Sequence, residues 1–404
     1  MTSSTDARGG SSWLWVLAAL LVACSYRPLP IAGDRAGTSG GASGSGGLSS
    51  ASGGSGAGGS GGSGIGGSGI GGSRGCAAVC AVEQICRADT CQPRITEFAL
   101  PPPVGAGPYG ITTGPDGALW FTEYNRAAIG RITIDGQITE YALLPTALPT
   151  SITTGPDGNL WFTESGTDDI GRITRDGTML RPFFSVAGSG QVSGPTTIIN
   201  GPDGNLWFTE SQSSRIGRIT PDGVVVERSP TTPGSRPAGL AVGIDGNLWF
   251  AEPGVSQIAW VTTQGVFREL QPSPPLTGND VAAGPDGSLW FVGSSTMGMG
   301  GVLRVTPGGT VAHFPTLSPA ARLPWAITAG PDGNLWFTYY FVTDRVARIG
   351  RVTPDGRFTD FMLNPPPAPP RSATLSTMGI TAGPDGNIWF TELADGRIGR
   401  LDPR

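Results

Sequence analysis

Charged side chains and histidine are scarce in this sequence. Only 14% of the 404 residues are charged, the formal net charge is −5, and His313 is the single histidine. A nucleic-acid-binding protein needs a basic face that neutralises phosphates, and this composition does not supply one. We therefore expect no nucleic-acid partner.

The apolar run near the N-terminus is too short to cross a bilayer. It covers residues 13–23, which is 11 residues, and it follows Arg8. A spanning helix needs about 20 apolar residues, whereas this length behind a positive charge is typical of an export signal. The run ends in the sequence LVAC, which resembles a bacterial lipobox. Residues 1–24 therefore predict a lipoprotein signal with Cys24 as the lipidated residue, and an ordinary signal peptide is the alternative.

The next segment lacks the apolar residues that a core requires. In residues 33–75, glycine occupies 21 of 43 positions, and most of the others are serine or alanine. Such a composition predicts a flexible tether over residues 25–75, with an end-to-end distance of roughly 35 Å. With the lipid on Cys24, we expect a monomer of the bacterial cell envelope, tethered to the outer membrane or the cell surface.

Four of the five cysteines lie close together in residues 76–94. They are Cys76, Cys80, Cys86 and Cys91. In an exported chain this clustering favours two disulfides, because zinc sites usually have two C-x2-C pairs that lie further apart. The sequence does not choose among the possible pairings.

Residues 95–404 lack the common catalytic motifs but repeat one unit seven times. They contain no cysteine, no Gly-x-Ser-x-Gly and no Gly-rich phosphate loop. The first unit, residues 109–141, shows the order, which is an apolar strand, a Gly-Pro-Asp-Gly turn, a Leu-Trp-Phe-Thr-Glu strand, an Ile-Gly-Arg-Ile-Thr strand, an Asp-Gly turn and a last strand. The anchor tryptophans are Trp120, Trp161, Trp207, Trp249, Trp290, Trp336 and Trp389.

Four short antiparallel strands per unit, at this period, indicate a blade of a β-propeller. We therefore predict an all-β fold, a seven-bladed β-propeller over residues 95–404. The seventh unit ends after its third strand, and residues 95–100 match a fourth strand at residues 138–143. The N-terminal strand is therefore expected to complete the last blade and close the ring, which removes an open edge.

Function is expected at the end of the ring where loop lengths vary, because binding residues concentrate on variable loops over a rigid scaffold. By register, one residue per blade begins the first strand at this mouth. These are Tyr109, Thr150, Thr196, Ala238, Asn279, Trp325 and Met378. The residues expected to bind a ligand are Tyr109, Trp325, Tyr339, Tyr340 and Met378. An aromatic mouth suits a peptide, a glycan or a small apolar molecule.

A glutamate ends the second strand in five blades. These residues are Glu123, Glu164, Glu210, Glu252 and Glu392. One interpretation is a site for a cation or a cationic ligand. The other is a structural role, in which the glutamates pair with Arg131, Arg172, Arg218 or Arg400.

The blade sequence Gly-Pro-Asp-Gly-Asn-Leu-Trp-Phe-Thr-Glu, followed by Ile-Gly-Arg-Ile-Thr, resembles the streptogramin B (virginiamycin B) lyases. The resemblance covers residues 95–404. It implies β-elimination of a depsipeptide lactone, in which a histidine removes a proton and Mg²⁺ polarises the ester carbonyl.

The positions that carry this chemistry are mostly substituted. The two family histidines correspond to Trp325 and Met378, and a family glutamate corresponds to Ser376. Glu392 alone retains a catalytic position of the family. The sequence therefore predicts a tethered binding propeller without the family's activity and without a cofactor. The alternatives are a Mg²⁺-dependent lyase that uses Glu392 and, third, a purely structural envelope protein.

Overall fold

The computed structural model describes residues 84–87, 90–103, 105–186, 192–230, 232–295, 300–315, 321–341, 347–363 and 377–404. The predicted export signal, Cys24, the tether, Cys76, Cys80 and Ser376 lie outside these residues and stay predictions. No helix in the described parts has the length and hydropathy needed to span a membrane.

Seven antiparallel sheets form the blades of a β-propeller, which confirms the predicted fold class. Blade 1 contains β4 (Pro108–Thr113), β5 (Leu119–Glu123), β6 (Ala128–Ile132) and β7 (Ile138–Ala142). Blade 2 contains β8 (Pro149–Thr154), β9 (Leu160–Glu164), β10 (Asp169–Ile173) and β11 (Met179–Ser185). Blade 3 contains β12 (Pro195–Asn200), β13 (Leu206–Glu210), β14 (Arg215–Ile219) and β15 (Val225–Arg228).

The remaining blades follow the same order. Blade 4 contains β16 (Ala238–Val242), β17 (Leu248–Glu252), β18 (Gln257–Val261) and β19 (Phe267–Leu270). Blade 5 contains β20 (Leu276–Ala283), β21 (Leu289–Ser295), β22 (Gly300–Val305) and β23 (Val311–Pro315). Blade 6 contains β24 (Ala321–Arg322), β25 (Ile327–Ala329), β26 (Leu335–Phe341), β27 (Ala347–Val352) and β28 (Phe358–Met362), and its first strand is split into β24 and β25.

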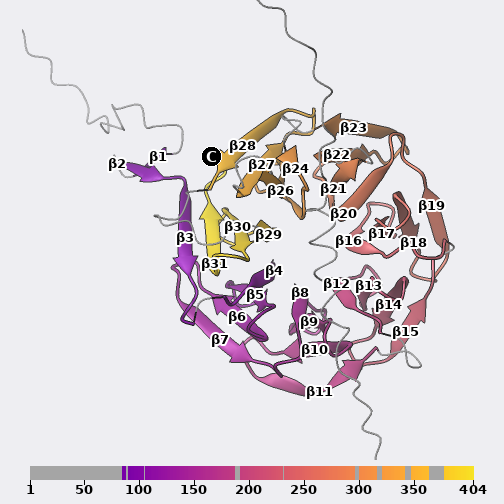
Figure 1. Cartoon of the computed structure of the whole chain (residues 1–404), viewed down its shortest axis with the longest axis horizontal. Coiled ribbons are helices and arrows are strands. Elements are labelled where there is room, and N and C mark those ends of the chain that lie inside the picture. Colours follow the sequence, from indigo (N-terminus) through magenta and orange to yellow (C-terminus); the bar gives the residue numbers. More distant parts are fainter. Residues whose placement is uncertain are drawn as a thin grey trace, which may run out of the picture. The chain divides into compact units, whose positions relative to one another are not determined.

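The N-terminal strand closes the ring, as predicted. Blade 7 contains β29 (Thr377–Ala382), β30 (Ile388–Glu392) and β31 (Arg397–Leu401), and β3 (Ile95–Ala99) is its outermost strand. Strand β3 pairs with β31 along its whole length, from Ile95 opposite Leu401 to Ala99 opposite Arg397. The first strands surround the centre of the ring, while β3 lies on the rim beside β31 (Figure 1).

A repeated side-chain cluster holds the turn end of most blades. In blade 1 the indole N–H of Trp120 donates to Asp116 of the Gly-Pro-Asp-Gly turn at 3.0 Å, and Arg131 donates to the same carboxylate at 2.7 Å. Trp120 is fully buried, so its N–H requires this partner. Equivalent bonds of 2.9–3.2 Å join the anchor tryptophan and the turn aspartate in blades 2, 3, 4, 6 and 7.

The predicted pairing of the repeated arginines with the glutamates is wrong. Arg131, Arg172, Arg218 and Arg400 each lie within 2.7–3.8 Å of the turn aspartate of their own blade. The register explains the difference, because Arg131 is opposite Trp120, whereas Glu123 is opposite Ala128. Trp120 and Glu123 are three positions apart, so their side chains point to opposite faces of the strand.

A two-stranded hairpin precedes the propeller in the sequence. It contains β1 (Gln84–Arg87) and β2 (Thr90–Pro93). Cys86 and Cys91 are partners in its backbone register. Direct cross-strand partners are close enough for a disulfide, and the predicted disulfides stay a prediction.

Candidate functional site

The mouth of the ring is built by a repeated irregularity in the first strands. The pairing between the first and second strands shifts by an extra residue near the start of β4, β8, β12, β16, β20 and β29. In blade 1 the shift frees the Gly110 N–H, which donates to the Thr122 hydroxyl at 2.9 Å. Bulges of this kind redirect side chains, and here they set the residues that reach the centre of the ring.

Threonine hydroxyls then join neighbouring blades around the mouth. Thr122 donates to the carbonyl of Thr150 at 3.1 Å, and Thr391 donates to the carbonyl of Tyr109 at 2.8 Å across the closing seam. Equivalent bonds connect blade 2 to blade 3 and blade 6 to blade 7. A threonine hydroxyl of the preceding blade therefore holds the backbone carbonyl of the mouth residue in four blades. These mouth residues are Tyr109, Thr150, Thr196 and Met378.

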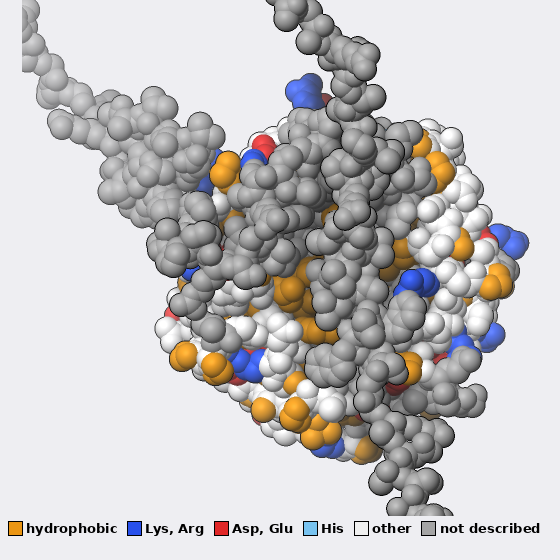
Figure 2. Space-filling view, in the orientation of Figure 1, with side chains coloured by type: hydrophobic (Ala, Val, Ile, Leu, Met, Phe, Trp, Pro, Cys, Tyr) orange, Lys and Arg blue, Asp and Glu red, His pale blue; other side chains and the backbone are white. Residues whose placement is uncertain are grey.

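Two predicted ligand-binding residues meet at the mouth. The Tyr109 ring of blade 1 packs edge to face against the Trp325 indole of blade 6, with centroids 6.5 Å apart and planes at 85°. The Tyr124 ring also packs against Tyr109, with centroids 5.9 Å apart and planes at 35°. All three side chains are half-buried. Hydrophobic side chains also gather at the middle of the face shown in Figure 2.

Asp280 is a site residue that the sequence analysis missed. Its Oδ2 accepts a hydrogen bond from the Ile327 N–H of blade 6 at 3.0 Å. Burial raises its pKa to about 7, and its charge contributes to the raised pKa of Tyr109, for which burial is the main cause. An acidic group with a near-neutral pKa therefore lies close to the Tyr109–Trp325 pair.

A within-chain comparison could have revealed Asp280. The residue after the mouth residue is small or carries a hydroxyl in every other blade. The equivalent residues are Gly110, Ser151, Thr197, Gly239, Ala326 and Gly379. In the pairing of β20 with β21, Gly278 and Asp280 lie opposite consecutive residues of β21. Asn279 therefore has no partner on β21 and is the inserted residue. The Asn279 amide donates to the Pro324 carbonyl of blade 6 at 2.8 Å, so it has a structural role between blades.

The other predicted ligand-binding residues offer little surface. Tyr339 is 5% exposed and packs in a hydrophobic cluster with Phe337, and Met378 is also 5% exposed. The Tyr340 side chain lies outside the part that the structure describes. Within the described residues, Tyr109 and Trp325 are therefore the predicted contacts that a ligand can reach.

The five glutamates are buried separately, one in each of five blades. Burial is the main cause of the raised pKa values, which reach about 8 for Glu123 and Glu392 and about 7 for Glu210 and Glu252. Glu164 and Glu210 accept hydroxyl hydrogen bonds from within their own loops at 2.8 and 2.6 Å. Among the described residues, no group of three or more His, Cys, Asp or Glu side chains could hold a metal.

The residues at the family's catalytic positions do not fit Mg²⁺. Glu392 is 6% exposed, and its Oε1 has no hydrogen-bond partner in the described structure. An indole has no lone pair for a metal, and Mg²⁺ prefers oxygen over the thioether of Met378. One buried carboxylate, an indole and a thioether do not make up the oxygen-rich site that Mg²⁺ requires. His313 does not replace them, since it lies on β23, the outermost strand of blade 5.

Solved structures of known proteins share this fold and about a third of the aligned residues. The chain is similar to the selenomethionine-substituted virginiamycin B lyase of Staphylococcus aureus, with 35% identity and a TM-score of 0.66. The match covers 77% of this chain and 99% of that one. A catalytically inactive variant of the same enzyme, solved with quinupristin, matches with 34% identity, coverage of 77% and 100%, and the same TM-score.

Matches to curated proteins are shorter. The virginiamycin B lyase of Saccharopolyspora erythraea is 51% identical over 49 residues, and that of Bordetella pertussis is 44% identical over 52 residues. These alignments span 12% and 13% of this chain, and only 16% and 17% of the length of the relatives. The profile of the Virginiamycin B lyase family matches residues 78–192, 185–374 and 279–404. The chain therefore belongs to the virginiamycin B lyase family.

Proposed function

We propose that this propeller binds a ligand at the mouth of its ring and lacks the lyase activity of its relatives. The observation that carries the proposal is the contact between the half-buried rings of Tyr109 and Trp325, because the family resemblance implies a histidine at the position of Trp325. Aromatic rings bind apolar groups, sugar faces and peptide side chains without reacting with them. The ligand is therefore a peptide, a glycan or a small apolar molecule.

Asp280 adds a preference for a basic group in that ligand. A carboxylate beside aromatic rings attracts an ammonium group, because the charge and the ring faces both favour a cation. With its pKa raised to about 7, Asp280 is largely ionised above neutral pH and can then attract a cation. Export, lipidation of Cys24 and the tether would place this site outside the cell, on the outer membrane or the cell surface.

The second candidate is a lyase with a rearranged site. It is favoured by two carboxyl groups with near-neutral pKa values, Asp280 and Glu392, since such groups are suited to proton transfer. β-Elimination would require one of them to reach the substrate carbon and remove a proton from it. Glu392 is nearly inaccessible, which favours the binding function.

Phenethylamine and its neutral analogue 2-phenylethanol test the binding proposal by calorimetry with the full chain. We expect the amine to bind more tightly, Asp280→Asn to remove this preference, and Trp325→Ala to weaken binding of both compounds. Asp222→Asn, a change at an exposed turn, is the control. The proposal fails if wild type binds neither compound saturably, or if Trp325→Ala binds both as wild type does.

A further inference from the structure

In five blades, a second aromatic ring packs over the anchor tryptophan. The ring comes from the outermost strand and stacks on the tryptophan with centroids 5.2–5.7 Å apart and planes within 29°. The stacked rings are Phe98, Tyr141, Phe184, Phe314 and Phe361. Blade 4 uses Trp260 instead, which stacks on Trp249 at 4.4 Å.

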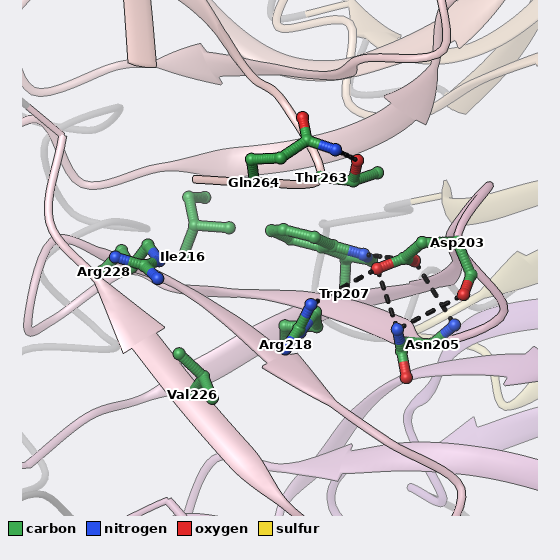
Figure 3. Close-up of a pocket in the computed structure, with 9 residues that line it drawn as sticks. All are labelled: Asp203, Asn205, Trp207, Ile216, Arg218, Val226, Arg228, Thr263 and Gln264. Atoms are coloured by element: carbon green, nitrogen blue, oxygen red, sulfur yellow. Dashed lines mark hydrogen bonds and ion pairs between the residues drawn. The ribbon is translucent and has the colours of Figure 1, made fainter. Parts of the chain in front are cut away.

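Blade 3 lacks this ring. Arg228 occupies the position, opposite Ile216, that Tyr141 occupies opposite Ile129 in blade 1. No ring stacks on Trp207 among the described residues, and a pocket of about 390 Å³ lies there instead. Blade 3 supplies Trp207, Ile216, Val226 and Arg228, and the turn of blade 4 supplies Thr263 and Gln264 (Figure 3). Because both turns of a blade lie at one end, this pocket is at the opposite end of the ring from the mouth.

The pocket gains positive charge relative to the equivalent places in other blades. Arg228 replaces an uncharged aromatic residue. Gln264 stands where the second turn has an aspartate in blades 1, 2, 3 and 6, namely Asp135, Asp176, Asp222 and Asp355. Compared with those blades, this place has gained a cation, Arg228, and has lost an anion, because Gln264 is uncharged.

A second arginine in the pocket is also less engaged than its counterparts. The repeated arginine donates to a backbone carbonyl of the next blade in four cases, for example from Arg172 to Pro221 at 3.1 Å. Arg218 has no such bond in the described structure, and its nearest carboxylate oxygen, on Asp203, is 3.7 Å away. The Arg218 and Arg228 guanidinium groups therefore both retain donors for a ligand.

Asp203 also lines the pocket, but its carboxylate is already occupied. It accepts from the Trp207 indole at 3.0 Å and from the Asn205 amide at 2.8 Å. Burial would raise the pKa of Asp203, but these hydrogen bonds outweigh that effect and lower it. The single charge of Asp203 offsets one arginine, so the pocket keeps a net positive charge.

We propose that this pocket is a second binding site, which takes a small organic carboxylate. Guanidinium groups bind carboxylates in a bidentate manner, and Gln264 and Thr263 add polar groups at the opposite wall. Trp207, Ile216 and Val226 supply an apolar wall for the body of the ligand. The assignment rests on blade 3 and blade 4 alone and is independent of the function proposed for the mouth.

Benzoate, its neutral analogue benzamide and inorganic phosphate test the site by calorimetry with the full chain. We expect saturable binding of benzoate, with both other compounds at least ten-fold weaker. Arg228→Gln should weaken benzoate binding at least ten-fold. Arg228→Phe should abolish binding, because it restores the ring found in five other blades and fills the pocket.

Arg357→Gln is the matched control, since Arg357 is 84% exposed on a turn of blade 6. Thermal melting of each variant verifies that the propeller is folded, and Arg228→Phe should melt no lower than wild type. The proposal is overturned if benzoate does not saturate wild type or binds Arg228→Gln equally well. Phosphate binding as tight as that of benzoate would overturn the assignment to an organic carboxylate.

Discussion

The phenol ring of Tyr109 in blade 1 meets the indole of Trp325 in blade 6 at nearly a right angle, although blade 7 lies between these blades in the ring. Tyr109 reaches this position because its carbonyl is held by Thr391 of blade 7. The indole occupies a position where the family resemblance implies a histidine. An aromatic contact therefore lies where the resemblance implies a base.

The first prediction concerns lyase activity. The full chain should not linearise quinupristin in the presence of Mg²⁺ beyond the rate of Glu392→Ala. Loss of a positioned base alone typically costs 10²–10⁴-fold in rate, and the described residues do not form a Mg²⁺ site. Mass spectrometry of the lactone measures the outcome. Turnover by wild type that disappears in Glu392→Ala would instead support the enzyme.

Activity should return only with several changes together. The triple variant Trp325→His, Ser376→Glu and Met378→His restores the family residues, whereas each single variant leaves the metal site incomplete. The same assay applies, with each single change as a control. Recovery in Trp325→His alone would contradict the need for a complete set.

The closing seam should dominate the stability of the ring. Deleting residues 95–101 removes the outer strand of blade 7 and exposes β31, so we expect a loss of several kcal/mol. Phe98→Ala removes only the ring that stacks on Trp389 and should cost about 2 kcal/mol. Chemical denaturation measures both, and an unchanged midpoint after the deletion would show that closure does not stabilise the fold.

Stability should fall as pH rises because of the buried glutamates. Burial, and then the charge of Glu269, raise the pKa of Glu252 to about 7. Between the ordinary pKa of glutamate and this value the folded protein binds the extra proton, so unfolding becomes easier as pH increases through that interval. Glu252→Gln should therefore stabilise the protein by roughly 1–3 kcal/mol more at pH 8 than at pH 5.

Denaturation of Glu252→Gln at the two pH values is compared with Asp222→Asn, a change at an exposed turn residue. The control should show no comparable difference. An equal effect of Glu252→Gln at both pH values would mean that the carboxyl group titrates normally.

The membrane anchor is tested in a bacterial host. Cys24→Ser should release the protein from the membrane fraction or stall its processing, because the lipid would have no attachment point. Fractionation and immunoblotting measure the distribution. A variant that remains with the membranes as wild type does would rule out lipidation at Cys24.

The fold was accessible from sequence because each blade repeats its own turn and anchor residues. Strand β3 could be assigned to blade 7 since residues 95–100 match residues 138–143. The partner of Arg131 was predicted wrongly. The alternation of side chains along β5 places Trp120, and not Glu123, on the same face of the sheet as Arg131.

The site was less accessible because its geometry depends on a bulge and on burial. Counting positions along the repeat selected Asn279 as the mouth residue of blade 5. The sequence does not show that β20 accommodates Asn279 as an extra residue. Asp280, the next residue, is therefore the side chain that the sequence analysis missed. Composition likewise identified Tyr339 as aromatic but not as a member of the blade core. These properties arise from packing between blades, which a repeat pattern does not encode.

The seam between β3 and β31 also constrains the order of folding. Arg397 pairs with Glu97 across a sequence separation of 300 residues. During synthesis β3 emerges before all the other strands of the propeller and β31 emerges after them, so β3 remains unpaired until β31 has been made. Closing so long a loop costs chain entropy and slows folding. Blade 7 is therefore expected to be the last blade to form, and a nascent chain would expose the open edges of the partial ring until then.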